Sequence, residues 1–149
     1  MSDLDTFTEP ELAVALRNSA AGSYQAEAAV ELLIAHGSWL RRGDFRAQAI
    51  WADGGADELV VGIDWGNAAE LLHDAPASAS ERRILSIALA LVEGQAHPVD
   101  LGDALSSLDG ANTAKVIHAV AHAAGLHERH SSIVINGHLD GLPDNRGAS

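Results

Sequence analysis

The chain has 149 residues, of which 21 are acidic and 9 are Lys or Arg, so its formal net charge is −12. This length suits one domain that buries a core without cross-links. Cysteine is absent, which excludes disulfides, cysteine-ligated zinc and a thiol nucleophile. The acidic balance disfavours nucleic acid and acidic membranes as partners. The N-terminus lacks the basic and apolar regions of a secretory signal, so we expect a cytoplasmic protein.

Residues 1–22 predict an acidic segment with one short helix. Thr8 and Glu11 have capping-box spacing, in which each side chain bonds a main-chain amide at the helix start. The predicted helix therefore begins at residue 9 and continues to about residue 18. Residues 23–127 are predicted to form a single helical domain. Its first helix, over 24–36, has Ser23 as its cap and Gly37 as its stop.

Residues 39–52 fit two kinds of element. Phe45 and Ala49 recur at helical spacing, whereas the apolar residues of 45–51 also alternate as they do in a strand. We favour a helix capped by Asp44.

A half-buried strand is predicted between Leu59 and Trp65, where every second residue is large and apolar. A lone strand leaves its backbone groups unpaired. We therefore expect it to pair with the short extended residues 99–101. The next predicted helix begins near residue 67 and ends before Pro76.

The most apolar helix is predicted to follow Ser78. Ser78 and Glu81 form a second capping box, and the helix continues to about Glu93. Its polar stripe is thin, so we expect it at the buried centre of the domain.

Residues 63–72 and 99–108 share one pattern: a β-branched residue, Asp, a large apolar residue, Gly, Asn or Asp, then Ala. Asp64 and Asp100 both precede a predicted helix, where a carboxylate stabilises the N-terminus. We expect them to act as caps rather than as catalytic groups. A true duplication and a shared preference for a strand-to-helix junction both remain open.

The C-terminal part predicts a short helix, a tight turn at 109–112 and a longer helix over 113–125. Asn136–Gly137 is a strong hairpin signal, and residues 128–149 are expected to form a hairpin or a loose tail. The predicted fold class is mainly α, with about five to six helices and a small two-stranded β ribbon. A winged-helix-like arrangement of the C-terminal half is an alternative.

The winged-helix alternative implies a DNA-binding transcriptional regulator. Its recognition helix would present early residues to the major groove, namely Asn112, Thr113, Lys115 and His118. Lys115 is the only lysine of the chain, and phosphate contacts by Lys and Arg supply most of the affinity for DNA. Nucleic acid is therefore an unfavoured partner.

A second alternative is a metal site in a histidine cluster, made of His118, His122, His127 and His130. The first two are one helical turn apart, a spacing that holds zinc, and His127 or His130 would be a third ligand. The general-base glutamate of zinc peptidases is replaced here by Ala119, which excludes that activity. The apolar side of this helix is predicted at Val116, Ile117, Val120 and Ala124, so both helical histidines are expected in solvent.

Two further groups have structural interpretations. Arg41, Arg42 and Arg46 predict a salt-bridged surface, with an anion site as the alternative. The aromatic residues cluster in one third of the chain and are expected to form the main aromatic core, with a partner-binding groove as the alternative; they are Tyr24, Trp39, Phe45, Trp51 and Trp65.

Several phrases resemble a family of small Ala-rich bacterial proteins of unknown function. They are His36-Gly-Ser-Trp-Leu-Arg-Arg42, Ile63-Asp-Trp65, Ser80-Glu-Arg-Arg-Ile-Leu85, Val99-Asp-Leu-Gly-Asp-Ala-Leu105 and His122-Ala-Ala-Gly125. The resemblance covers residues 28–125 and implies a single domain. It implies no activity, cofactor or site residue.

Catalytic signatures are missing from the sequence, so no catalytic or cofactor-binding residue is predicted. No Gly-x-Ser-x-Gly elbow or phosphate-binding loop pattern occurs. The leading hypothesis is a non-enzymatic protein-interaction or regulatory module, whose partner is another protein or a second copy of the chain.

Overall fold

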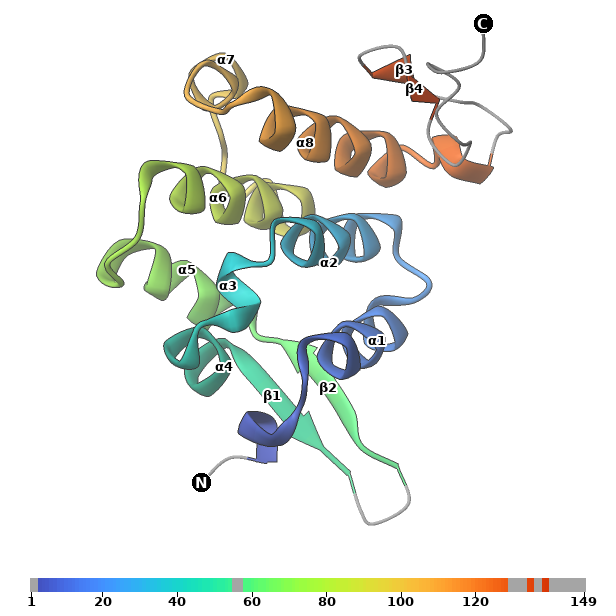
Figure 1. Cartoon of the computed structure of the whole chain (residues 1–149), viewed down its shortest axis with the longest axis vertical. Helices are drawn as coiled ribbons and strands as arrows, with labels where there is room; N and C mark the ends of the chain where they lie inside the picture. The colour runs from blue at the N-terminus through green and yellow to red at the C-terminus, as the bar shows by residue number, and fades with distance from the viewer. Residues whose placement is uncertain (1–2, 55–57, 129–133, 136–137, 140–149) are drawn as a thin grey trace, which may run out of the picture.

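The computed structural model describes residues 3–54, 58–128, 134–135 and 138–139, and its described part is mainly helical (Figure 1). The elements, in chain order, are η1 (Asp3–Thr6), α1 (Glu9–Ala20), α2 (Tyr24–His36), α3 (Ser38–Arg41), α4 (Gly43–Ala49), β1 (Ile50–Asp53), β2 (Val60–Ile63), α5 (Trp65–Asp74), α6 (Ala79–Glu93), α7 (Leu101–Ser106), α8 (Gly110–Ala123), η2 (Leu126–Glu128), β3 (Val134–Ile135) and β4 (His138–Leu139). A mainly α fold with a small ribbon is confirmed. In the described residues, no helix is both long and apolar enough to cross a membrane.

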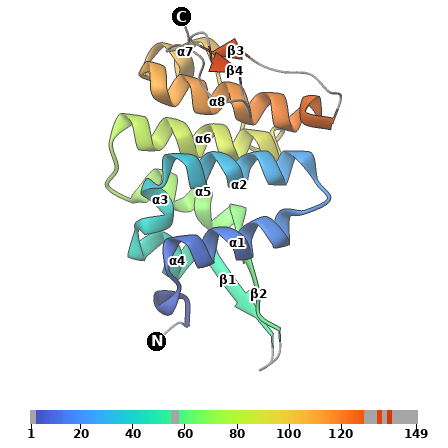
Figure 2. The same cartoon turned by 45° about the vertical axis from the view of Figure 1, so that its right-hand side comes forward.

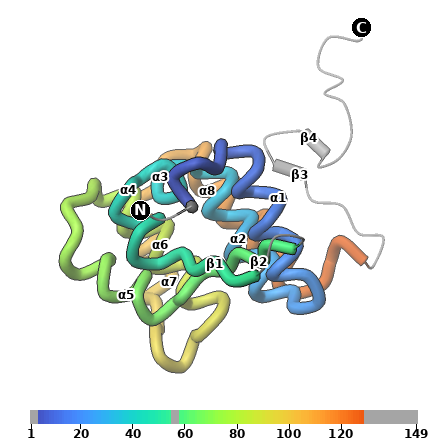
Figure 3. Tube along the Cα trace, turned by 90° about the horizontal axis from the view of Figure 1, so that it is seen from below, coloured from blue at the N-terminus to red at the C-terminus, as the bar shows by residue number. Residues whose placement is uncertain are grey.

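The helices lie in layers. α8, α6 and α2 follow one another down the molecule, with α1 below them and the β1–β2 ribbon extending beyond α1 (Figures 1 and 2). α2 is the central helix, because it packs against α1, α3, α6 and α8. Seen from below, α1 lies along the ribbon (Figure 3), consistent with its packing on β2. The boundary predicted after residue 22 falls in the turn between α1 and α2, and both helices contribute to one core.

Helix starts follow the predicted caps except in α4, which begins at Gly43 without a side-chain cap; the predicted cap Asp44 lies inside this helix and binds Arg42. Thr8 and Ser78 each complete a capping box with the glutamate three residues later. Asp64 and Asp100 accept bonds from the amides of Asn67 and Asp103 at 2.9 and 3.0 Å. Both aspartates are therefore caps, as predicted, and losing such a cap costs about 1 kcal/mol.

The ribbon differs from the prediction in its partner. β2 pairs with β1 in antiparallel register, with Trp51 opposite Gly62. The ambiguous segment is thus helix up to Ala49 and strand from Ile50, whereas residues 98–100 have no strand structure. A short connection between β1 and β2 costs less loop entropy than the long connection to 99–101. The pairing with 99–101 is therefore wrong.

The core is centred on α2 and α6, as expected for α6. Ile84, Leu85 and Leu89 of α6 are fully buried. Trp39 and Phe45 are also fully buried, with ring centroids 5.7 Å apart. Trp51, by contrast, is 43% exposed, so the predicted aromatic core was only partly right.

The arginines bind carboxylates and main-chain carbonyls. Arg41 pairs with Glu9 at 3.4 Å and Arg42 with Asp44 at 2.7 Å, which confirms the salt-bridged surface. Arg46 instead donates to the carbonyls of Leu40, Leu4 and Phe7 at 2.7, 3.3 and 2.8 Å. It thereby fastens η1 to the α3–α4 region.

The orientation of α8 corrects the predicted apolar side. Asn112, Val116 and Ala119 are buried, whereas Ile117 and Val120 are 40% and 47% exposed. Small side chains let α8 approach α2 and α6 closely, and this packing decides the rotation of the helix. Val116 was therefore predicted correctly, whereas Ile117, Val120 and Ala124, which are all exposed, were not.

The C-terminal hairpin follows its sequence signal. β3 and β4 pair with Ile135 opposite His138, as the hairpin signal predicts, while Asn136 and Gly137 themselves lie outside the described residues. The element order of the winged-helix alternative is thus present from α6 to β4, except for its strand at 99–101.

His36, at the end of α2, gives stability a pH dependence. Its Nδ1 is buried and has no hydrogen-bond partner within the described part of the chain. Burial, followed by the positive charges of Lys115 and Arg41, lowers the pKa of His36 below 6.5. As the pH falls, His36 is therefore protonated in the unfolded chain at a higher pH than in the folded chain. The contribution of neutral His36 to the stability of the folded state is complete above pH 6.5 and is lost as the pH falls toward the lowered pKa.

We expect His36→Gln to flatten the fall in unfolding free energy between neutral pH and about pH 5, a range set by the usual histidine pKa. Urea denaturation at several pH values measures this fall. His73→Gln, at an exposed position of α5, is the control and should keep the wild-type slope. Equal slopes in wild type and His36→Gln would contradict the assignment.

Candidate metal centre

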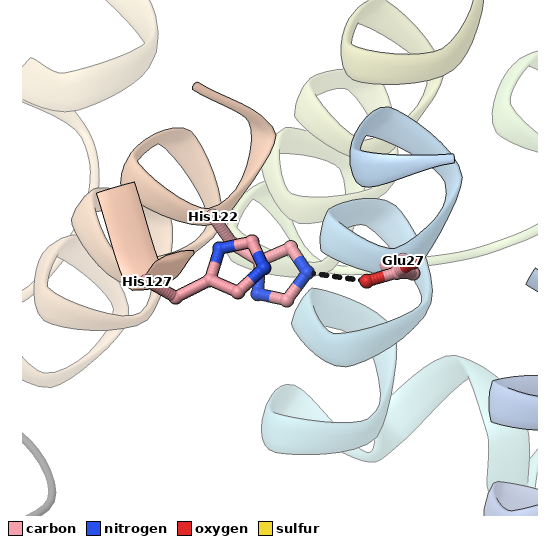
Figure 4. A group of neighbouring side chains, drawn as sticks. All are labelled: Glu27, His122 and His127. Atoms are coloured by element: carbon pink, nitrogen blue, oxygen red, sulfur yellow. Dashed lines mark hydrogen bonds and ion pairs between the residues drawn. The ribbon is translucent and has the colours of Figure 1, made fainter. Parts of the chain in front are cut away.

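Three metal-ligating side chains from three elements come together at one end of α2. Glu27 lies in the first turn of α2, His122 in the last turn of α8 and His127 in η2. Each offers one ligand atom, and these atoms all lie within 4.8 Å of one another. Figure 4 shows the two imidazoles side by side with Glu27 approaching from the opposite helix.

The contacts within this Glu27–His122–His127 cluster are close. Glu27 Oε1 lies 2.8 Å from His122 Nε2, and the side chains of this pair are 25% and 26% exposed. The rings of His122 and His127 stack with centroids 3.8 Å apart and an interplanar angle of 8°. His127 is exposed, so the cluster is accessible to an ion from solvent.

The cluster favours an ionised carboxylate. The hydrogen bond from His122, then the Gly22 amide that donates to Glu27 Oε2 at 3.0 Å, lower the pKa of Glu27 below 4.5. The positive forms of His122 and His127 act in the same direction. The Glu27 carboxyl group is therefore ionised at neutral pH.

Tyr24 supports both imidazoles from the side. Its ring lies edge-on to His122 and His127, with centroid distances of 6.3 and 5.0 Å. Its hydroxyl donates to Glu128. Such contacts around a ligand fix the orientation of its ring.

Gly125 provides the space for Tyr24. Its φ is +75°, and a Cβ at this position would lie 3.0 Å from Tyr24 Cε2. The backbone therefore turns from α8 into η2 directly against the Tyr24 ring, which brings His127 back toward His122.

The structure brings together two of the four histidines that were predicted to form a cluster. His122 and His127 meet, and His118 is not a member of the group. His118 and His122 are half-buried, which corrects their predicted exposure. His130 lies outside the described residues.

Sequence reasoning missed Glu27 because it belongs to the polar face of α2. Its partner His122 is 95 residues away in the chain, and no local pattern joins them. The position of Glu27 next to Tyr24 and Ser23 indicates only a helix start.

The DNA-contacting residues of the winged-helix alternative make internal contacts. Asn112 is buried and its amide donates to Ser80 Oγ at 3.1 Å. Lys115 donates to Asn112 Oδ1 at 3.4 Å, and the Thr113 hydroxyl donates to the carbonyl of Asp109 at 2.8 Å. These bonds direct Asn112 toward α6 rather than toward a DNA groove.

Comparisons with protein-family models, curated proteins and solved structures find no match to this chain. The resemblance over residues 28–125 thus stays a prediction. The functional proposal consequently depends on the geometry of the site itself.

Gly125→Ala should destabilise the protein by about 1–2 kcal/mol, the cost of a left-handed backbone for a residue with a Cβ. Close contact with Tyr24 adds to this cost. Gly110→Ala is the matched control, because Gly110 is at the start of α8 and a Cβ added there would have nothing within 4 Å. Chemical denaturation compares the two, and equal stability of both variants would contradict the role of Gly125.

Proposed function

We propose that the chain is a non-enzymatic binding module whose ligand is a divalent transition-metal ion, with zinc as the best fit. The observation that carries this proposal is the convergence of Glu27, His122 and His127 donor atoms within 4.8 Å. Two imidazoles and one carboxylate form a ligand set that suits zinc and related ions better than calcium or magnesium.

Binding would require His127 to leave its stacked position on His122, because an ion lies in the plane of each imidazole that binds it. Zinc lies about 2.0–2.2 Å from nitrogen and oxygen ligands, so two ligands of one tetrahedral ion are about 3.3 Å apart. Glu27 Oε1 and His122 Nε2 are 2.8 Å apart and would separate slightly as an ion replaces the proton between them. His127 is exposed and can rotate to bring its nitrogen closer. Water would complete a four-coordinate site.

The proposed role is structural and regulatory. The three ligands belong to α2, α8 and η2, so a bound ion would join the ends of these elements. Three cavities elsewhere on the described part of the protein are lined by none of these ligands. The origin of the ligands in three different elements favours a clamp over a reaction centre.

Isothermal titration with ZnCl₂ should show one site per chain, and thermal unfolding should shift upward. Zinc at about one hundred times its Kd would add about 2.7 kcal/mol of stability. His122→Ala, His127→Ala and Glu27→Gln should each weaken binding, because each removes a ligand. Acidification should also weaken it, because protons compete for both imidazoles.

His118→Ala is the matched control, since His118 is on the same helix but outside the cluster. It should bind zinc as the wild type does. If His118→Ala lost zinc binding and His122→Ala kept it, the zinc site would have to lie away from Glu27. No zinc binding by the folded wild type would refute the proposal.

A second candidate function is recognition of a cationic protein segment by the ribbon. Trp51 and Val60, which the strand register places on one face of the ribbon, are 43% and 41% exposed. The Trp51 indole lies across Gly62, where a Cβ would be only 2.3 Å from Trp51 Cζ2. Trp51 also lines a cavity of about 110 Å³ shared with α1 and α2. Exposed tryptophan beside a hollow is typical of interaction hot spots.

The acidic residues beside these exposed apolar side chains favour a positively charged partner. Asp53 and Glu58 flank the apolar side chains and are exposed, and β1 and β2 carry no basic residue. A segment that alternates Lys with Leu therefore complements the surface in both charge and polarity.

Fluorescence anisotropy of a labelled alternating Lys-Leu peptide tests this function. We expect binding that weakens with salt and at least about tenfold in Trp51→Ala. Leu101→Ala, at a residue 55% exposed elsewhere, should have no effect. Equal binding of a Glu-Leu peptide would show that charge does not select the partner.

A further inference from the structure

An exposed apolar stripe on α8 is separate from the cluster and the ribbon. We define the α8 stripe as Thr113, Ile117, Val120 and Ala124. These positions recur at intervals of four, three and four residues, so they share one face of the helix. Ile117 and Val120, at its centre, are 40% and 47% exposed, although β-branched apolar residues usually lie inside.

The α8 stripe lies on a helix that carries no carboxylate. No residue from Gly110 to Ala124 is acidic, and Lys115, the one Lys or Arg there, bonds Asn112. Two other exposed apolar side chains lie next to carboxylates in the sequence: Leu101 follows Asp100, and Leu59 follows Glu58. For a chain of net charge −12, two copies meet with least repulsion at a carboxylate-free face.

The spacing of the stripe is self-complementary. If two α8 helices cross antiparallel about a two-fold axis between positions 117 and 120, Ile117 faces Val120 of the second copy. The same axis places Thr113 opposite Ala124 of the second copy. A two-fold contact needs this property, because each residue pair occurs twice. Antiparallel alignment also places opposite helix dipoles side by side.

We propose that the chain forms a symmetric dimer through the α8 stripe. The small side chains of Ala114 and Ala124 let two helices approach within the 8–10 Å typical of packed helices. The contact is independent of the metal centre, since His122 faces Glu27 of its own chain.

Sedimentation velocity over a range of protein concentrations tests the dimer. We expect a monomer–dimer equilibrium whose dissociation constant rises at least about tenfold in Ile117→Glu and in Val120→Glu. Each change brings two like charges across the axis. Val14→Glu, at a residue of α1 that is 56% exposed, is the matched control and should dimerise as the wild type does.

A charge pair tests the register. The double variant Ile117→Glu/Val120→Lys places opposite charges across the proposed axis and should associate more strongly than either Glu variant. Circular dichroism confirms that each variant is folded. A wild type that is monomeric at every concentration, or a Val120→Glu variant that dimerises as well as the wild type, would overturn the proposal. Neither result bears on zinc binding.

Discussion

The packing of α2 against α6 and α8 is the interaction on which the rest of the structure depends. α2 contributes five buried residues to the core, and each of its two ends holds a group whose pKa is lowered. Glu27 in its first turn meets the end of α8, while His36 in its last turn is covered near α3 and the starts of α6 and α8. A shift of α2 would therefore separate the proposed metal ligands and also expose His36.

Local signals predicted the helices well, because the interactions that begin and end a helix lie within four residues of one another. The Thr8 and Ser78 capping boxes and the left-handed Gly37 are of this kind. The same reasoning found caps at Asp64 and Asp100, where an acid beside a helix could have suggested catalysis. The Asn136–Gly137 hairpin was predictable for the same reason.

Long-range contacts were not predictable from these signals. The alternation of Leu59, Val61 and Ile63 suits any half-buried strand, so it does not select β1 over residues 99–101 as the partner. The rotation of α8 depends on which small residues its neighbours present, and Ala119 proved to be buried where Val120 was expected. The site was half predictable: the sequence spacing singles out His122 and His127, but Glu27 joins them only through tertiary packing.

The alanine content of the helices explains how the side chains of Glu27 and His122 can reach each other from two different helices. Ala28 and Ala29 of α2 and Ala119 of α8 are buried, and aromatic residues make up only 4% of the chain. Helix separation depends on the side chains at the contact. Larger residues at these positions would hold α2 and α8 farther apart, and the bond between Glu27 and His122 would lengthen beyond hydrogen-bonding range. The small residues that look least informative in the sequence thus bring Glu27, His122 and His127 together.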